Sequence, residues 1–217
     1  NGEKVDSIDF TNTYVGEIEI AGTKTWNDNG DQDGIRPTSI TVNLLANGEK
    51  VKDQKVTPDG NGNWNYKFEK LPEYNENGKI TYTVTEDAVE GYTTELDGNN
   101  FINTHVPETT EISGTKTWDD AEDQDGKRPE NITVKLLANG EEVNSQTVTP
   151  DEDGSWAYSF TDLPKFVNGQ EITYTVSEPP VEDYTTTYDG YNIINSYTPG
   201  QTSATITKLW ADADNQD

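Results

Sequence analysis

Apolar residues recur at every second position through most of this chain, which is the period of a β-strand with one buried face. The segment EIEIAGTKTW, residues 17–26, is an example. The residues that share one face of this predicted strand are Ile18, Ile20, Gly22, Lys24 and Trp26. Similar runs predict about seven strands in the first half of the chain, at roughly 16–26, 38–46, 49–57, 63–69, 79–87, 91–96 and 99–105. No long segment has helical periodicity, so an all-β fold is expected.

The whole pattern repeats after 92 residues. GTKTWNDNGDQDGIRP returns as GTKTWDDAEDQDGKRP, and ITVNLLANGE returns as ITVKLLANGE. FTNTY near the start matches FINTH at 101–105, and a third start, ITKLWADADNQD, places Lys208 92 residues after Lys116. Such self-similarity predicts an array of like domains. The expected organisation is the last strand of a preceding repeat at 1–15, complete repeats at 16–107 and 108–199, and the first strand of a following repeat at 200–217.

Turn residues separate the predicted strands at short, regular intervals. Asn47-Gly48 and Asp97-Gly98, with their equivalents 92 residues on, predict two hairpins in each repeat. Many short strands joined by such turns favour tandem Greek-key β-sandwiches. The joins at 105–113 and 197–204 are short and contain proline, so neighbouring repeats are expected to contact one another with limited freedom.

Composition narrows the possible functions. The 217 residues carry a formal net charge of -26, which argues against nucleic acid or an anionic membrane surface as partner. The chain has no Cys, no Met and one His, so disulfides, thiolate metal sites and most histidine chemistry are excluded. No apolar run approaches the roughly 18 residues of a membrane span, and no cofactor-binding or hydrolase motif appears. We therefore expect a monomeric segment without cofactor or metal, and not a turnover enzyme.

Three polar residues in each repeat fall on the predicted core face. Lys24 shares the apolar face of its strand, and Glu86 follows Ile80, Tyr82 and Val84 in the same alternation. The last strand is ambiguous because both of its faces carry apolar groups, but one face offers an asparagine. The complete sets are Lys24, Glu86 and Asn103 in the first repeat and Lys116, Glu178 and Asn195 in the second.

Two interpretations of these residues stay open on the pattern alone. The first is a buried Lys–Glu ion pair with the asparagine hydrogen-bonded nearby, or a lysine that reaches the rim of the core. The second is chemical: an uncharged amine is a nucleophile and a carboxamide carbon an electrophile, so the two can form an amide and release ammonia. Burial favours the neutral forms of both an amine and a carboxyl, and a neutral carboxyl can polarise the carbonyl and move protons.

Several motifs together carry a resemblance to a known family. GTKTW, DQDGxRP, LLANG, the YTVTE and YTVSE strands and the closing INT and INS resemble, in order and spacing, the Cna protein B-type repeat of Gram-positive surface adhesins and pilins. The resemblance covers nearly the whole chain and implies tandem Greek-key β-sandwiches. It also implies an intramolecular isopeptide bond that joins Lys24 to Asn103 with Glu86 as catalyst, and Lys116 to Asn195 with Glu178.

The resemblance implies a stalk function and a location. The repeats would be spacers in an extracellular, cell-wall-anchored bacterial adhesin, whose contact with a host surface or matrix protein lies in a domain outside this segment. A rival interpretation is that the repeats themselves bind a host matrix protein or glycoprotein, for which an exposed apolar or aromatic patch is expected. Asn12 and Lys208 belong to incomplete repeats and are expected to stay unreacted.

Two further features are interpreted as structural. The turn N-x-D-x-D-G at Asn29–Gly34 begins like a calcium loop, but the later glutamate is missing and the second copy has Ala121 in place of Asn29. An acidic, solvated turn is the favoured interpretation. His105 becomes Tyr197 in the second repeat, which indicates a packing or linker residue and not a metal ligand.

Overall fold

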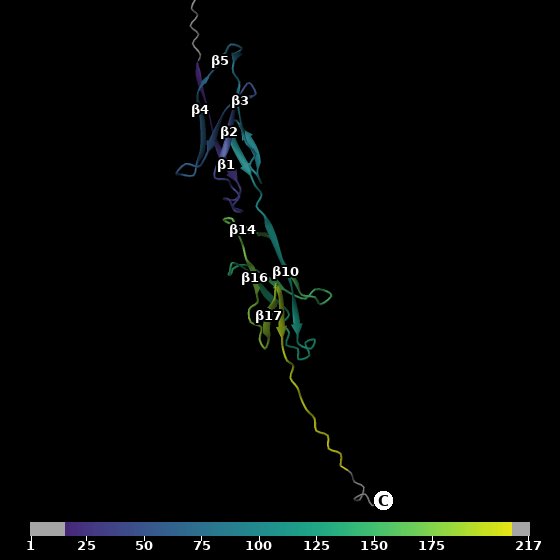
Figure 1. The fold of residues 1–217 in the computed structure, drawn as a ribbon. Helices are drawn as coiled ribbons and strands as arrows, with labels where there is room; N and C mark the ends of the chain where they lie inside the picture. The colour runs from purple at the N-terminus through teal and green to yellow at the C-terminus, as the bar shows by residue number, and fades with distance from the viewer. Residues whose placement is uncertain (1–15, 210–217) are drawn as a thin grey trace, which may run out of the picture. The chain divides into compact units, whose positions relative to one another are not determined.

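The structure, a computed structural model, describes residues 16–209. Within this range every regular element is a β-strand, so no helix is present that could cross a membrane. The described residues form two compact units, one of residues 16–108 with the hairpin at 164–171, the other of 109–163 and 172–209 (Figure 1). The repeat boundaries expected from the sequence stay predictions.

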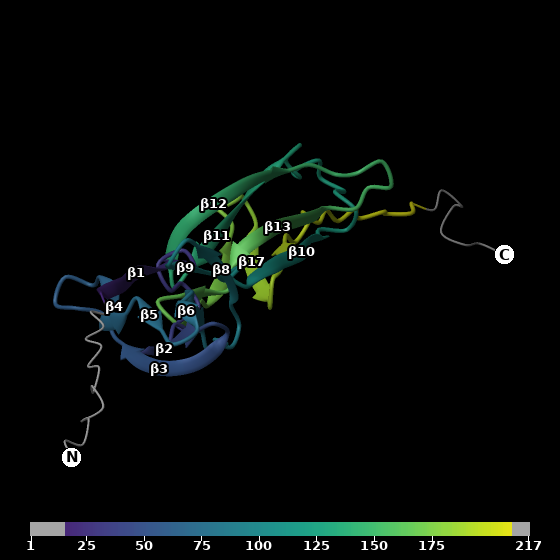
Figure 2. The same cartoon turned by 90° about the horizontal axis from the view of Figure 1, so that it is seen from above.

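The first repeat consists of two main sheets and one small hairpin. Its strands are β1 Glu17–Asn27, β2 Ile40–Ala46, β3 Glu49–Val56, β4 Trp64–Pro72, β5 Tyr74–Asn75, β6 Gly78–Lys79, β7 Tyr82–Glu86, β8 Thr93–Asp97 and β9 Asn100–Thr104. One sheet has the order β4-β1-β9-β8 and the other β3-β2-β7, while β5 and β6 pair with each other. Figure 2 shows β2 and β3 as a layer separate from that of β1 and β9.

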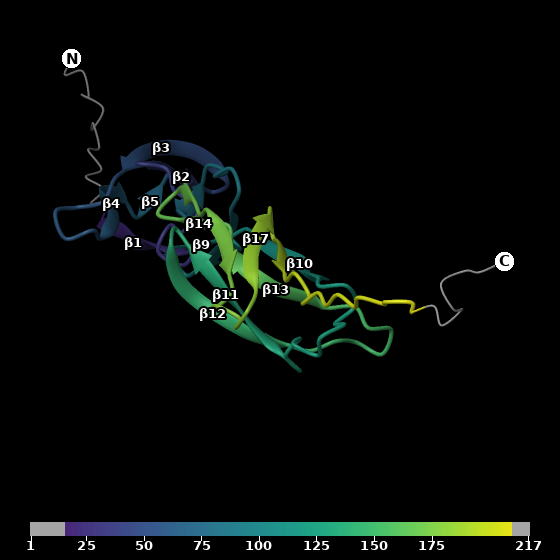
Figure 3. The ribbon, with the colours of Figure 1, turned by 90° about the horizontal axis from the view of Figure 1, so that it is seen from below.

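The second repeat follows the same plan. Its strands are β10 Thr109–Asp119, β11 Ile132–Ala138, β12 Glu141–Val148, β13 Ala157–Pro164, β14 Phe166–Val167, β15 Gln170–Glu171, β16 Tyr174–Ser177, β17 Thr185–Asp189 and β18 Asn192–Ser196. The sheets have the orders β13-β10-β18-β17 and β12-β11-β16, with β14 paired to β15. The neighbouring strands β11 and β12 are visible in Figure 3. Each repeat is therefore a β-sandwich, as the sequence predicts.

The apolar faces of the two sheets form the core of each repeat. In the first repeat the buried cluster includes Val42 and Leu44 from one sheet, and Tyr66, Phe68 and Phe101 from the other. The second repeat buries the equivalent set. Burial of one such side chain contributes roughly 1.5–3 kcal/mol to folding. The core thus holds together two sheets between which none of the described strands pair.

The first and last strands of each repeat are neighbours in one sheet. β1 and β9 pair in parallel with Lys24 opposite Phe101 and Trp26 opposite Asn103. β10 and β18 pair in the same register, with Trp118 opposite Asn195. Alternation along β1 and β9 turns Lys24 and Asn103 toward the core, since both are buried. The faces predicted for β1 and β7 are confirmed by their burial patterns.

Most predicted hairpins and strands are observed, with one difference. Asn47 and Gly48 have φ values of 52° and 92° and join β2 to β3, while Asp97-Gly98 lies between β8 and β9. The strand predicted at 79–87 is divided instead, because Lys79 pairs with Tyr74 in the β5–β6 hairpin before β7 begins at Tyr82.

The two incomplete repeats can be compared with the structure only in part. Asn12 and the strand predicted at 1–15 lie outside the described residues. Residues 200–209, which include Lys208, are described and form no strand.

Candidate functional site

A lysine lies inside each sandwich. Lys24 on β1 and Lys116 on β10 are each 4% exposed, and their side chains are fully buried. Nζ of Lys24 lies 4.4 Å from the centroid of the Trp26 ring, and Nζ of Lys116 lies 3.8 Å from that of Trp118. The ring face attracts a cation, but this attraction offsets only part of the hydration free energy that a buried ammonium loses.

A glutamate from the opposite sheet faces each lysine. Nζ of Lys24 lies 3.4 Å from Oε1 of Glu86 and 3.5 Å from Oε2. The side chain of Glu86 is also fully buried. Burial lowers the pKa of Lys24 to about 8, against the opposing effect of the Glu86 carboxylate. At a given pH the neutral amine is therefore far more populated than in an exposed lysine, whose pKa is about 10.4.

The second repeat has the same pair at a longer distance. Nζ of Lys116 lies 4.0 Å from Oε1 of Glu178 and donates a hydrogen bond of 3.2 Å to the backbone carbonyl of Thr117. Burial again lowers the pKa of Lys116 to about 8, although the Glu178 carboxylate acts in the opposite direction.

The asparagine of the last strand completes each set. Asn103 and Asn195 are 0% exposed, and neither side-chain oxygen nor side-chain nitrogen has a hydrogen-bond partner among the described residues. In the parallel register, each asparagine follows by two residues the position on its own strand that lies opposite the lysine. A buried carboxamide without partners costs roughly 1–3 kcal/mol or more for each unsatisfied group, so it requires an explanation.

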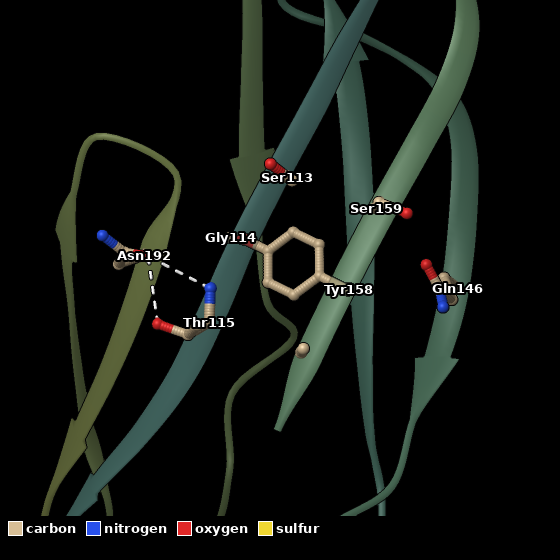
Figure 4. Close-up of a pocket in the computed structure, with 8 residues that line it drawn as sticks. Ser113, Gly114, Thr115, Gln146, Tyr158, Ser159 and Asn192 are labelled. Atoms are coloured by element: carbon tan, nitrogen blue, oxygen red, sulfur yellow. Dashed lines mark hydrogen bonds between the residues drawn. The ribbon is translucent and has the colours of Figure 1, made fainter. Parts of the chain in front are cut away.

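The hairpin that carries the asparagine is fixed to the strand that carries the lysine. In the second repeat Oδ1 of Asn192 accepts hydrogen bonds from the backbone N and Oγ1 of Thr115, both 3.1 Å (Figure 4). The side chain of Tyr158 lies against Gly114, and its hydroxyl donates a hydrogen bond to the backbone carbonyl of Tyr191. A Cβ at Gly114 would lie 2.2 Å from that carbonyl oxygen, so only glycine permits this approach.

The first repeat has the same fixation through Asn100, Thr23, Tyr66 and Gly22. Together these contacts set the register of the two terminal strands. The surface hollow around Tyr158 in Figure 4 is lined by neither Lys116 nor Asn195.

Sequence reasoning missed a second polar cluster beside the lysine. Asp28 accepts hydrogen bonds from Arg36 Nε at 2.9 Å and from the Tyr92 hydroxyl at 2.9 Å, and Arg36 lies over the ring of Trp26. Although burial opposes the effect, the hydrogen bonds from Arg36, the Asp31 amide and Tyr92 lower the pKa of Asp28 to about 2. The second repeat has Asp120, Arg128 and Tyr184 in these places. The recurrence of Asp and Arg at fixed spacing after each GTKTW was the available signal.

The acidic turn uses its carboxylates for bonds within the protein. Asp31 accepts a hydrogen bond from the Arg36 amide, and Asp33 contacts His105 Nε2 at 2.8 Å and accepts a hydrogen bond from the Glu108 amide at 2.8 Å. No grouping of three or more potential metal ligands occurs among the described residues. His105 thus holds the end of the repeat against the turn.

Comparison with known proteins identifies the family. The Cna protein B-type domain model matches residues 20–104 and again residues 112–196. The chain belongs to the Cna B-type family. Each match contains one complete set of buried lysine, glutamate and asparagine.

Two relatives show which proteins contain such Cna B-type repeats. A collagen adhesin of Staphylococcus aureus is 46% identical over 98% of this chain, which spans 18% of the relative. The crystal structure of two B repeat units of the Staphylococcus aureus collagen-binding protein is 47% identical, with a TM-score of 0.75 over 93% of this chain and 55% of that one. The relatives are thus named as a collagen adhesin and as B repeat units of a collagen-binding protein.

Proposed function

We propose that each Cna B-type repeat closes an amide bond between Lys24 and Asn103, or between Lys116 and Asn195, and that the repeats serve as a covalently stabilised spacer. The observation that supports the bond most strongly is the buried carboxamide without hydrogen-bond partners, which lies in the core near a buried lysine of lowered pKa. A simple ion pair with a nearby asparagine leaves that carboxamide unexplained. Conversion of the carboxamide into a cross-link removes its unsatisfied NH2 group.

The proposed reaction needs no reagent beyond the three side chains. A proton passes from the Lys24 ammonium to the Glu86 carboxylate, 3.4 Å away, which gives a neutral amine and a neutral acid. Nζ then attacks Cγ of Asn103 while the acid donates to the carbonyl oxygen, and the carboxyl carries a proton from Nζ to the departing Nδ2. One C–N bond forms and one breaks. As the carbonyl re-forms, the proton on its oxygen returns through the carboxyl group to the released ammonia, so one ammonium ion leaves. The glutamate ends as it began, so it acts as a single-turnover catalyst.

Intact mass tests this proposal. Two closures remove two molecules of ammonia, so the native chain is expected to weigh about 34 Da less than its sequence mass. Lys24→Ala and Lys116→Ala should each restore about 17 Da, and the double variant the whole deficit. An unshifted mass in folded native protein rejects the bond.

The position of the bond supports a spacer function. It would join the first strand to the last, the two strands through which tension enters and leaves a repeat in a tandem array. The enclosed segment is 79 residues long, from Lys24 to Asn103. By the loop-entropy relation for cross-links such a closure stabilises the folded state by about 4.5 kcal/mol. This is comparable with the whole stability of a small domain.

The family relationship supports the cellular setting. We infer that the chain is part of an extracellular surface protein attached to the cell wall of a Gram-positive bacterium, with host-matrix binding carried by another domain. Collagen binding is a property of the named relative, of which this chain covers a minor part. The exposed large apolar residues of the first repeat come from different elements, among them Ile35, Val51, Tyr74 and Leu96, which favours a spacer over a binding face.

A further inference from the structure

A threonine on the strand next to the asparagine contacts the glutamate in both repeats. Oγ1 of Thr94 on β8 donates to Oε2 of Glu86 at 3.2 Å, and Oγ1 of Thr186 on β17 donates to Oε2 of Glu178 at 3.2 Å. Thr94 lies directly opposite Asn103 in the antiparallel register, as Thr186 lies opposite Asn195. Directly opposed residues present their side chains on the same face of a sheet, so the threonine is next to the reacting carboxamide.

We propose that Thr94 and Thr186 are positioning residues for isopeptide formation, which hold the glutamate carboxyl group through Oε2 and leave Oε1 to carry the transferred proton. This inference rests on the proposed function. In the first repeat Nζ of Lys24 lies 3.4 Å from Oε1 of Glu86 and donates a hydrogen bond of 3.5 Å to Oε2, whereas Oε1 has no hydrogen-bond partner. Oε1 of Glu178 is likewise buried without a hydrogen-bond partner.

The hydroxyl decides which carboxyl oxygen carries the proton of the neutral acid. Because Oε2 accepts the threonine hydrogen bond, the acidic proton resides on Oε1, which lies 3.4 Å from Nζ of Lys24. From there it reaches the Asn103 carbonyl, and the same oxygen passes a proton from Nζ to the departing ammonia. The threonine itself neither gains nor loses a proton in the reaction.

Comparison of the two repeats supports this assignment. The distance from lysine Nζ to Oε1 differs, 3.4 Å in the first repeat and 4.0 Å in the second, whereas the threonine–glutamate distance is 3.2 Å in both. The carboxyl group is therefore positioned by the threonine and the strand pairing, and it does not follow the position of the ammonium.

Matched threonine variants test the proposal in the full chain. Thr94→Val removes the hydroxyl at nearly constant shape, and Thr94→Ser keeps it. Thr93→Val is the control, because Oγ1 of Thr93 donates to the backbone carbonyl of Thr104 and not to the glutamate. Freshly synthesised protein is sampled over time at several pH values, and the loss of about 17 Da per repeat gives the rate of bond formation.

The expected result is that Thr94→Val slows closure of the first repeat roughly tenfold, the value of one hydrogen bond in the transition state, while Thr94→Ser stays near the native rate. The pH profile of the Thr94→Val rate should also move upward, because the carboxylate has lost a donor that favours its ionised form. Thr93→Val should change neither the rate nor the profile. The second repeat of the same chain is an internal reference in each case.

Other outcomes overturn the proposal at different levels. A native rate and profile in Thr94→Val, with the usual ammonia loss in the native chain, reject the threonine role alone. Equal slowing by Thr93→Val and Thr94→Val without a change of profile also rejects it, because it shows only a general structural effect. If Thr94→Val fails to fold, Thr186→Val applies the same test to the second repeat. A native chain of unshifted mass rejects the proposed function and this inference together.

Discussion

The two repeats bring the same three residue types together with different contacts around the lysine. Lys24 contacts both carboxylate oxygens of Glu86 at 3.4 and 3.5 Å, whereas Lys116 lies 4.0 Å from Glu178 and donates to the Thr117 carbonyl. The parallel register of first and last strands is identical in both. The backbone framework therefore defines the site, while the ammonium group has room to adjust within it.

A second difference lies behind the glutamate. In the second repeat the Glu178 amide donates to the Tyr188 hydroxyl at 3.0 Å, and Glu178 is 8% exposed. The first repeat has Leu96 at the corresponding position, which offers no acceptor. A third difference is at the end of each repeat, where His105 contacts Asp33 and Tyr197 donates to Asp125.

The largest expected effect comes from breaking one cross-link and leaving the other. In a single-molecule pull from both ends, the native repeats should show no long extension, because force passes through the covalent bonds. Lys24→Ala should release the 79 residues that the bond encloses, an extension of about 28 nm at roughly 3.5 Å per residue. Lys116→Ala should release the same length from the second repeat.

The double variant Lys24→Ala with Lys116→Ala is the control, and it should show two such events. Full-length unfolding of the native repeats in the same experiment contradicts the spacer mechanism.

The next effect separates the catalyst from the reacting groups. Glu86→Ala should leave a folded first repeat that retains its ammonia, because the amine and the carboxamide remain without a proton carrier. Intact mass should then show a deficit of about 17 Da from the second repeat alone. Glu178→Ala should likewise leave a deficit of about 17 Da, in this case from the first repeat alone. Loss of ammonia at the native rate from a Glu86→Ala repeat means that the glutamate has another role.

A smaller effect is expected where the repeats differ behind the glutamate. Tyr188→Phe removes the acceptor of the Glu178 amide and should destabilise the second repeat by about 1 kcal/mol, while its cross-link still forms. Urea unfolding of the chain in the Lys116→Ala background measures this change without the cross-link. Leu96→Phe in the Lys24→Ala background is the matched control, and an equal loss in both would show that the hydrogen bond is unimportant.

The smallest effect is a pH dependence confined to the first repeat. Nδ1 of His105 faces the Gly91 carbonyl at 2.9 Å and Nε2 faces Asp33, so only the imidazolium donates to both. The hydrogen bond to Asp33 raises the pKa of His105 above 6.5, so the stabilisation is complete below about pH 6.5 and is lost as the pH rises through the raised value. The hydrogen bond to Asp125 raises the pKa of Tyr197 above 10.0, so no such change is expected in the second repeat at neutral pH.

NMR titration of the His105 ring measures this directly, with Asp33→Asn as the control that should lower the pKa toward its ordinary value. A native pKa at or below 6.5 contradicts the assignment.

Much of the fold could be predicted from the sequence because its signals are local. Alternation along 17–26 and the Asn47-Gly48 turn each depend on neighbouring residues, and both are observed. The β5–β6 hairpin was missed because two-residue strands have no periodicity to detect. The inward direction of Lys24 and Glu86 followed from the same alternation.

What the sequence did not reveal depends on long-range pairing. The parallel contact of β1 with β9 brings together residues nearly 80 positions apart, and no local pattern encodes it. The ambiguity of the last strand was resolved by this pairing, which directs Phe101 and Asn103 inward. The network of Asp28, Arg36 and Tyr92 joins a turn to a distant segment, and the short spacing of Asp28 and Arg36 suggested only a turn.

Mass spectrometry of a proteolytic digest of the native chain tests the two isopeptide bonds directly. Two branched peptides are expected, one joining the segments around Lys24 and Asn103 and one joining those around Lys116 and Asn195. Each should be about 17 Da lighter than its two linear parts together. Fragmentation should place each link at the lysine Nζ and the asparagine Cγ. Recovery of all four segments as separate linear peptides of full mass would contradict the proposed bonds.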